Sequence, residues 1–521
     1  MDKITNTITG SRKTRSCVAF LLVCINIMLF FPTGDSGVQR RWESTKGRGS
    51  QGEISLHDIT RASSIDELFG LNDLFWKLGI TGTGSTLAVV DTGINASHEV
   101  FQGKSVHWKD VSPENYSSSM DLDGHGTMCA SLGVGNASGF TGSAPGANLA
   151  AIKMFYMEDG SPTAENIDAL NAVNYIIDQA STLNITVASC SWGDDNDSAD
   201  GRDELSQIMA TLPQHDVITV VAQGNREVGL SRVAAPGAAP SLITVGSFDE
   251  DLFGVASHNL IGPNAGGHLK PDVIAPGVDL EGAALGGGYR IGSGTSYATP
   301  VAAGIFLLIK EKYPSMNHTQ VKHLACMAAL ETRYTSGSQD NHEGWGLLNP
   351  VGMVMLQENK WNSTEQQNVS IPLTPWNAST RSYFTKLQVS PGSTHVVKLA
   401  IDQDLGEHYQ AYIFQEEPTA NGVPVLLSRS HGGLLFFTAS KGNQYYLAIK
   451  PLPSAWNVES SGIVPTMRLE CTVTDLIDNA LIGGIIMAIL GIAIAIAISV
   501  QLIHELQKRR NGEEMVHSRG M

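Results

Sequence analysis

The sequence predicts an α/β unit with a doubly wound, mostly parallel sheet, followed by a β-rich, sandwich-like domain and one transmembrane helix. In residues 64–356, short apolar runs alternate with longer amphipathic runs, which is the pattern of βα units. In residues 361–474 the runs are short and separated by Gly, Pro, Asn and Ser, which favours antiparallel strands. Residues 480–500 carry no charge, and as a helix they would span roughly 30 Å, enough to cross a bilayer.

Within the α/β unit, short and continuously apolar runs are predicted to be buried strands. They cover residues 86–90, 148–154, 186–188, 217–222 and 242–245. A helix is predicted over residues 164–180, because apolar side chains repeat on one face at Ile167, Leu170, Val173, Ile176 and Ile177. In open α/β sheets ligands bind at the carboxyl ends of the strands. Asp91 and Asn225 each follow such a run and are therefore candidate site residues.

The β-rich region carries no group of residues that suggests catalysis. Its predicted strands cover residues 395–401, 409–414, 423–427, 433–438 and 444–450. We expect this region to stabilise or position the α/β unit, and a carbohydrate- or protein-binding module is the alternative.

Composition indicates a folded protein of two or more domains. The chain has 521 residues, of which 42% are apolar and 16% charged. Its net charge of −17 argues against nucleic acid as a partner and is accounted for by solubility.

The beginning of the chain has the pattern of a secretory signal. Arg12, Lys13 and Arg15 precede an apolar run over residues 17–31. Residues 1–37 are therefore predicted to be a signal peptide, with an uncleaved signal anchor as the alternative. Residues 38–63 are too few for a core of their own, and we expect a short propeptide or an N-terminal linker.

The end of the chain has the pattern of a membrane anchor. The predicted transmembrane helix covers residues 480–503, and residues 504–521 are the predicted cytoplasmic tail. Lys508, Arg509 and Arg510 follow the helix, and basic residues beside a span stay in the cytosol. We expect a single-pass type I protein of the secretory pathway or the cell surface, with its main body lumenal or extracellular.

Cysteines and glycosylation motifs agree with that compartment. Cys129, Cys190, Cys326 and Cys471 lie outside the predicted signal, which allows three pairings if all are bridged. The alternative is that some are buried free thiols, Cys129 first among them. Asn-x-Ser/Thr motifs predict a glycosylated ectodomain. They occur at Asn95, Asn115, Asn136, Asn184, Asn196, Asn317, Asn362, Asn368 and Asn377.

Three short segments carry an acid, an imidazole and a hydroxyl. Asp91 begins Asp-Thr-Gly, His125 lies in Gly-His-Gly-Thr, and Ser296 lies in Gly-Thr-Ser-Tyr-Ala-Thr-Pro. A serine needs a base to take its proton as it attacks an amide, and an imidazole oriented by a carboxylate supplies that base. We therefore expect a catalytic triad of these three residues. The alternative is that they are a turn residue and two helix caps.

Ser296 also begins an apolar, small-residue run that ends at residue 310 and is predicted to be a long buried helix. At a helix N-terminus, free N–H groups and the positive end of the dipole stabilise an oxyanion. Pro300 is expected in the first turn of this helix.

In these motifs, and in the order Asp, His, Ser, the chain resembles the subtilisin-like serine proteases (subtilases, peptidase family S8). The resemblance covers residues 64–356 and implies a reaction that requires no cofactor. It also implies that the side-chain amide of Asn225 donates to the oxyanion, where the alternative is a turn residue after glycine. Ser191, Trp192 and Gly193 match the segment that pairs with the substrate backbone.

An acidic run follows this segment and contains Asp194, Asp195, Asp197, Asp200 and Asp203. Three interpretations stay open, namely attraction of a basic substrate side chain, a calcium site, or a solvated loop. Ser-Trp-Gly followed by acidic residues resembles kexin and furin, the convertases that cut after basic residues, and so do residues 125–130. Residues 270–277 and 294–300 are closer to the broader subtilases.

Together these patterns predict a membrane-anchored serine endopeptidase that acts on protein or peptide substrates through an acyl-enzyme. One alternative is a proprotein convertase that cleaves after basic residues. Another is a non-catalytic receptor or adhesion protein that retains the fold. Subtilases usually carry a folded inhibitory prodomain, for which residues 38–63 are too short, so the activation route stays open.

Overall fold

The computed structural model describes residues 65–194, 197–226, 231–332, 339–362, 367–370, 382–388, 395–400, 409–430, 434–439, 444–452 and 466–475. The chain divides into two compact units, Met1–Asp58 and Ile59–Met521, and all the described residues belong to the second. The predicted signal peptide, linker, transmembrane helix and tail lie outside the described residues. Within the described part, no helix is both long enough and apolar enough to cross a membrane.

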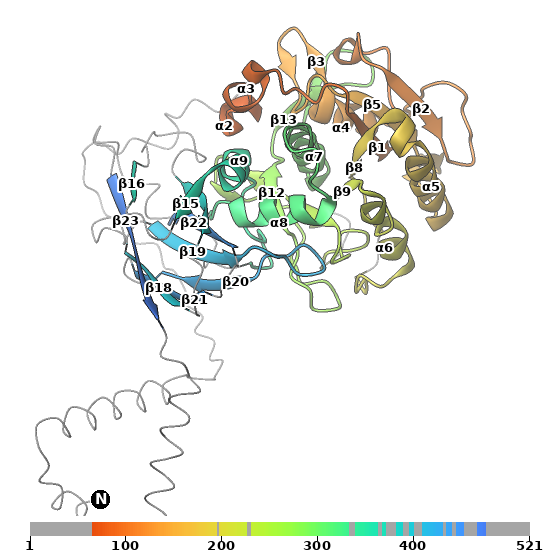
Figure 1. Cartoon of the computed structure of the whole chain (residues 1–521). Coiled ribbons are helices and arrows are strands. Elements are labelled where there is room, and N and C mark those ends of the chain that lie inside the picture. Colours follow the sequence, from red (N-terminus) through yellow and green to blue (C-terminus); the bar gives the residue numbers. More distant parts are fainter. Residues whose placement is uncertain are drawn as a thin grey trace, which may run out of the picture. The chain divides into compact units, whose positions relative to one another are not determined.

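The α/β unit is built on one mixed sheet with the strand order β11-β10-β9-β8-β1-β5-β2, and β12 also pairs with β10 (Figure 1). Its pairs are parallel except β10–β11, which is antiparallel. The strands are β1 (Thr86–Asp91), β2 (Val106–Asp110), β5 (Asn148–Lys153), β8 (Ile185–Cys190), β9 (Ile218–Ala222), β10 (Ile243–Asp249), β11 (Gly254–Val255) and β12 (Val273–Pro276).

Helices cover both faces of this sheet (Figure 1). In β1, Leu87 and Val89 join the core that holds α4 (His125–Val134) and α7 (Thr295–Lys312). Ala88 and Val90 join the core that holds α5 (Asn166–Leu183) and α6 (Glu204–Met209). Successive strand residues point to opposite faces, so a strand covered on both faces is apolar throughout.

The remaining elements of this unit are short or lie at its margins. They are α2 (Ile65–Phe69), α3 (Leu71–Leu74), η2 (Trp76–Leu78), η3 (Glu99–Phe101), β3 (Asn136–Ala137), β4 (Phe140–Thr141), β6 (Tyr156–Glu158), β7 (Ser161–Thr163), η4 (Leu212–His215), β13 (Leu280–Ala283), β14 (Tyr289–Gly292), α8 (His318–Ala328) and α9 (Pro350–Glu358).

The predicted buried face of α5 is partly wrong. Ile167 and Leu170 are 53% and 38% exposed, although they were expected to be buried with Val173 and Ile176. The face that packs on the sheet consists of Ala169, Ala172, Val173 and Ile176. Small alanines let the helix approach the sheet closely. The larger apolar side chains lie elsewhere on the helix, so their pattern in the sequence indicated the wrong face.

The bounds of several strands also differ from the prediction. β8 extends beyond residues 186–188 at both ends, and β10 continues to Asp249. Cys190 pairs with Val221, and Phe248 pairs with both Val255 and Pro276. Pairing with neighbouring strands therefore sets where a strand ends. The apolar run of one segment carries no information on that pairing.

The described strands of the β-rich region form two sheets. One has the order β15-β17-β22-β19-β20 and is antiparallel except for the parallel pair β15–β17. The other has the order β16-β23-β18-β21 and is antiparallel. The strands are β15 (Lys360–Asn362), β16 (Gln367–Ser370), β17 (Tyr383–Gln388), β18 (His395–Ala400), β19 (Tyr409–Gln415), β20 (Leu426–Arg429), β21 (Leu434–Ala439), β22 (Gln444–Pro451) and β23 (Thr466–Asp475).

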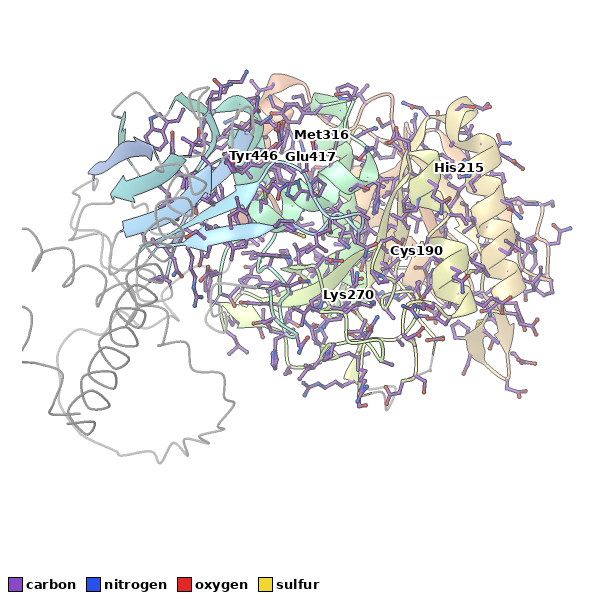
Figure 2. All side chains as sticks on the ribbon, turned by 60° about the horizontal axis from the view of Figure 1, so that its bottom comes forward. Cys190, His215, Lys270, Met316, Glu417 and Tyr446 are labelled. Carbon is purple, nitrogen blue, oxygen red and sulfur yellow. The ribbon has the colours of Figure 1, made fainter. Side chains whose placement is uncertain are left out.

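Alternate residues of β22 belong to two different cores. Leu447 and Ile449 pack with Leu435 and Phe437 of β21, which places the two sheets face to face as a sandwich. Tyr446 belongs instead to the core of α4 and α7, and its ring lies 6.0 Å from that of His323 in α8, measured between centroids (Figure 2).

The first sheet therefore packs against the α/β unit, and the two regions share one core. Phe384 of β17 and Phe414 of β19 belong to the same buried cluster as the helices of the α/β unit. The rings of Phe414 and Trp345 lie 5.8 Å apart, and the side chain of Asn359 donates to the carbonyl of Phe384 at 2.9 Å. The end predicted near residue 356 falls inside α9, whose residue Leu356 is itself buried in this shared core.

The cysteines follow the alternative of buried free thiols, which the sequence left open beside a disulfide framework. Cys129, Cys190 and Cys326 are all free and buried, in α4, β8 and α8 respectively. Figure 2 shows Cys190 within the α/β unit. With these three unbridged, none of the three pairings that join all four cysteines remains.

The shared core predicts that substitution in the β-rich region destabilises the α/β unit. Phe384→Ala removes a fully buried ring and should lower the free energy of unfolding by about 3–5 kcal/mol. Chemical unfolding followed by circular dichroism measures this, and one cooperative transition is expected to shift as a whole. Leu427→Ala, at a position 40% exposed on β20, is the control and should leave the midpoint nearly unchanged. A separate early transition of the β-rich region alone would contradict the shared core.

Candidate active site

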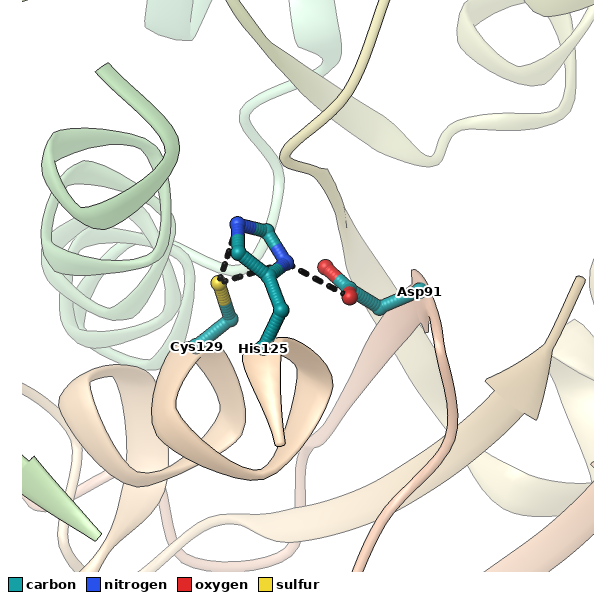
Figure 3. A group of neighbouring side chains, drawn as sticks. All are labelled: Asp91, His125 and Cys129. Carbon is teal, nitrogen blue, oxygen red and sulfur yellow. Dashed lines mark hydrogen bonds and ion pairs between the residues drawn. The ribbon is translucent and has the colours of Figure 1, made fainter. Parts of the chain in front are cut away.

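Two of the predicted site residues meet where β1 ends and α4 begins. Asp91 is the last residue of β1 and His125 the first of α4. Nδ1 of His125 lies 2.8 Å from Oδ1 of Asp91 (Figure 3), and the same oxygen accepts the N–H of Thr92 at 2.7 Å. The Asp91 side chain is 2% exposed and the His125 side chain 25%. A buried carboxylate that binds one ring nitrogen leaves the other nitrogen, Nε2, as the base.

The electrostatics of this pair favour the imidazolium. Burial of the ring disfavours its charged form, but the Asp91 carboxylate outweighs that cost, with a smaller contribution from Cys129. The pKa of His125 is therefore raised well above its usual value of 6.5. Such a residue readily holds the proton that a serine gives up during attack.

A residue outside the predicted site holds the two segments together. The Asp121 carboxylate is 6% exposed. Its Oδ1 accepts the hydroxyl of Thr92 at 2.9 Å and the N–H groups of Gly124 and Asp123 at 2.8 and 3.1 Å. Its Oδ2 accepts the N–H and hydroxyl of Thr127 at 2.9 and 2.5 Å. Sequence reasoning missed this role, although an aspartate shortly before the beginning of a helix is a signal for it.

Close backbone approach completes the junction. The N–H of Gly126 donates to the hydroxyl of Thr92 at 2.9 Å. A Cβ at Gly126 would lie 2.2 Å from the carbonyl oxygen of Gly93. Glycine is therefore required here, because α4 packs directly on the backbone that follows Asp91.

Ser296 lies at the N-terminus of α7, as predicted, and next to α4. Its carbonyl oxygen is 3.4 Å from Sγ of Cys129, and that sulfur is 3.7 and 3.9 Å from the two ring nitrogens of His125. The Ser296 hydroxyl donates to the carbonyl of Ser191 at 3.0 Å, and the described contacts include no hydrogen bond from it to His125. Catalytic hydrogen bonds are often long or misaligned without substrate, so Ser296 remains the candidate nucleophile.

Pro300 does not occupy the first turn of its helix, because α7 begins at Thr295. Pro300 has no N–H, so the carbonyl of Ser296, four residues earlier, lacks its helical partner. The thiol of Cys129 donates to that carbonyl. This bond links α4 and α7 at the site and gives the buried thiol a partner.

The candidate oxyanion donors surround a small space beside Ser296. Oδ1 of Asn225 accepts the N–H and hydroxyl of Thr295 at 3.1 and 3.2 Å, which orients the amide. A Cβ at Gly294 would lie 3.4 Å from Nδ2 of Asn225 and 3.8 Å from the N–H nitrogen of Ser296. Gly294 thus keeps open the space that both nitrogens border, which is the arrangement an oxyanion hole requires.

The segment Ser191, Trp192 and Gly193 follows β8 directly and lies beside the site. Trp192 is anchored by its indole N–H, which donates to the carbonyl of Val90 at 2.8 Å, and its ring packs edge-on against Phe155. Since Ser191 also accepts the Ser296 hydroxyl, this segment borders the candidate nucleophile.

The carboxylates of the acidic run accept hydrogen bonds in separate parts of the structure. Asp194 accepts the N–H of Ala235 at 3.0 Å, and Asp203 caps α6. Asp197 binds the N–H and hydroxyl of Ser231, and these bonds lower its pKa. Among the described residues, the run supplies no three convergent cation ligands, and Asp195 lies outside the description. A calcium site here stays a prediction.

The predicted glycosylation positions differ in exposure. Asn115, Asn136, Asn184 and Asn317 are exposed, and Asn95 is half-buried, with its amide donating to the carbonyl of Leu285 at 2.8 Å. The side chains of Asn196, Asn362, Asn368 and Asn377 lie outside the description. Glycosylation itself stays a prediction.

Comparison with known proteins identifies the family. The Subtilase family model (Peptidase_S8) matches residues 82–346, more than half of the chain. The chain belongs to the subtilase family, whose members are serine protease hydrolases. This confirms the resemblance that the motifs indicated, and the matched residues contain Asp91, His125, Asn225 and Ser296.

Known proteins match about half of the chain. Serine protease AprX of Bacillus subtilis (strain 168) is 32% identical over 272 residues, 47% of this chain and 61% of AprX. Subtilisin BL of Lederbergia lenta is 30% identical over 273 residues, 52% of this chain and 91% of that protein. Among solved structures, Sphericase is 26% identical, with a TM-score of 0.46, over 56% of this chain and 99% of its own.

The bonds to Asp121 predict a coupled loss of stability and activity. Asp121→Ala should lower the free energy of unfolding by at least about 2 kcal/mol, since each buried donor left unsatisfied costs about 1–3 kcal/mol. In the folded fraction kcat/KM should fall about 100-fold, because a shift of about 1 Å in a catalytic group has that effect. Urea unfolding and peptide hydrolysis measure the two. Asp123→Asn, an exposed change in the same loop that keeps the acceptor for the His125 N–H, should resemble wild type.

The raised pKa of His125 predicts the acidic limb of the pH profile. The base must be neutral, so activity falls as pH drops through this pKa, and the midpoint of kcat/KM should lie above 6.5. Asp91→Asn removes the main interaction that raises the pKa. The limb should then move to lower pH while kcat falls by about 10⁴-fold, because the amide favours the wrong tautomer. An unchanged limb in Asp91→Asn would show that another group titrates.

Proposed function

We propose that this protein is a serine endopeptidase that hydrolyses peptide bonds through an acyl-enzyme. The observation that carries the proposal is the buried bond between Asp91 and His125, placed beside Ser296 at the N-terminus of α7. These residues give an oriented base, a nucleophile and a positive helix end in one place.

The reaction follows from this arrangement. The Ser296 hydroxyl turns from Ser191 toward Nε2 of His125, which takes its proton as the oxygen attacks the substrate carbonyl. Nδ2 of Asn225 and the N–H of Ser296 donate to the oxyanion, and loss of one such donor typically costs about 10²–10³-fold in kcat. His125 then protonates the leaving amine, and water activated by the same nitrogen releases the acyl group.

Location at a membrane is part of the proposal. It is supported by the uncharged run over residues 480–500, the basic residues 508–510 that follow it, and the basic and apolar pattern of residues 12–31. In this arrangement the subtilase unit works on the lumenal or extracellular side, on protein or peptide substrates, with glycans on exposed asparagines.

A more specific alternative is that the endopeptidase cleaves after basic residues. It is supported by the acidic run beside Gly193 and by the resemblance of residues 125–130 to kexin and furin. Cleavage of a randomised peptide library tests this alternative. Convertase specificity requires Lys or Arg at the residue before the cut, and an equal preference for all residues at that position contradicts it.

A non-catalytic receptor is the second alternative, favoured by one observation, the bond from the Ser296 hydroxyl to Ser191 in place of His125. A fluorophosphonate probe separates the two. Labelling of the wild-type chain is expected, because the probe reacts only with an activated serine, and it should vanish in Ser296→Ala. Ser293→Ala, three positions earlier and just before α7, is the matched control and should label normally. A folded wild-type chain that does not label supports the receptor.

A further inference from the structure

We propose that Arg290 determines specificity on the leaving-group side of the site, where its guanidinium favours Asp or Glu among the first two residues after the cut. The inference rests on the proposed function, because it names a preference of the same site. Arg290 lies in β14 and is exposed. Its Nη2 donates to the carbonyl of Gly124 and to the hydroxyl of Tyr297, each at 3.4 Å.

The two partners of Arg290 place its guanidinium beside the candidate base. Gly124 directly precedes His125, and Tyr297 directly follows Ser296. The rings of Tyr297 and His125 lie 5.7 Å apart, measured between centroids. In the proposed reaction the imidazole protonates the leaving amine, so the part of the substrate that follows the cut lies on the side of this ring. Arg290 is therefore next to the residues that leave first.

The backbone that carries Arg290 is fixed against α4. Arg290 pairs with Gly282 of β13, and the N–H of the next residue, Ala283, donates to the hydroxyl of Ser131 in α4 at 3.0 Å. A Cβ at Gly282 would lie 2.7 Å from the side chain of Met128, so this hairpin packs closely on the helix that begins at the candidate base. A charge on a rigid element loses less entropy when it binds a substrate than a charge on a mobile loop does.

The guanidinium of Arg290 keeps donors for a substrate. Arginine presents five N–H donors in a planar fork that matches a carboxylate, and the described contacts of Arg290 use Nη2 alone. Among the described residues, no ion pair joins Arg290 to a carboxylate. The carboxylates of two neighbouring segments bind other groups: Asp123 accepts the N–H of His125 at 3.0 Å, and Glu99 accepts the hydroxyl of Tyr289 at 2.9 Å. An acidic side chain of the substrate therefore complements this charge.

Cleavage of peptides randomised at the two positions after the cut tests the proposal in the purified full-length chain. Wild type should prefer Asp or Glu over Lys by about 10-fold in kcat/KM, which is the effect of one hydrogen bond to a charged group. Arg290→Lys keeps the charge and should keep the preference for acidic residues. Arg290→Gln should abolish the preference and Arg290→Glu should reverse it. In wild type the preference should weaken in about 1 M salt, because salt screens exposed charges.

A purely structural role of Arg290, as a bridge between the beginnings of α4 and α7, gives a different result. Arg290→Gln would then lower kcat for every peptide by the same factor and leave the ratio of acidic to basic peptides unchanged. That outcome overturns the proposal, and so does a wild type that cleaves peptides without the preference. Arg429→Glu makes the same charge change at an exposed position of β20 and is the control, which should leave the ratio at its wild-type value.

Failure of the proposed function is recognised separately. A folded wild-type chain that cleaves no peptide and does not react with a fluorophosphonate removes that function alone, and peptide binding then decides the role of Arg290. Titration calorimetry compares Asp-Ala-Ala with Lys-Ala-Ala, which represent the fragment after the cut. Tighter binding of the acidic peptide by about 10-fold in wild type, lost in Arg290→Gln, supports the role. Equal binding of the two peptides to such a wild type overturns it.

Discussion

The candidate site depends on one buried carboxylate. Asp121 accepts five hydrogen bonds from the loop after β1 and from the beginning of α4. A buried carboxylate is stable only when its oxygens are satisfied, so these donors cannot move apart without a large cost. The distance between Asp91 and His125 is therefore set by a third residue that need not touch a substrate.

Burial on two faces explains how the rest of the structure supports that junction. Leu87 and Val89 of β1 face one helical layer and Ala88 and Val90 the other, so the strand that ends at Asp91 is held from both sides. β22 repeats the arrangement, with Tyr446 toward the α/β unit and Leu447 toward the second sheet. The β-rich region thereby becomes part of the packing behind the site.

Sequence patterns predicted the α/β unit, the strands before Asp91 and Asn225, and the helix after Ser296, because each depends on neighbours along the chain. They failed where packing partners decide. The buried face of α5 contains small alanines, whereas Ile167 and Leu170 were expected there and are exposed. Pairing with neighbouring strands made β8 and β10 longer than predicted. Pro300 lies deeper in its helix than expected, and its missing N–H is offset by a thiol from another helix.

By itself the sequence determined which chemical groups are present and in what order, and the family follows from that order. Only the tertiary structure decided that Asp91 binds His125, that the Ser296 hydroxyl rests on Ser191, and that three cysteines stay free. The physical reason is that a hydrogen bond or a buried contact joins atoms within a few ångströms. The partners here come from segments that are far apart along the chain and meet only when both faces of the sheet are covered.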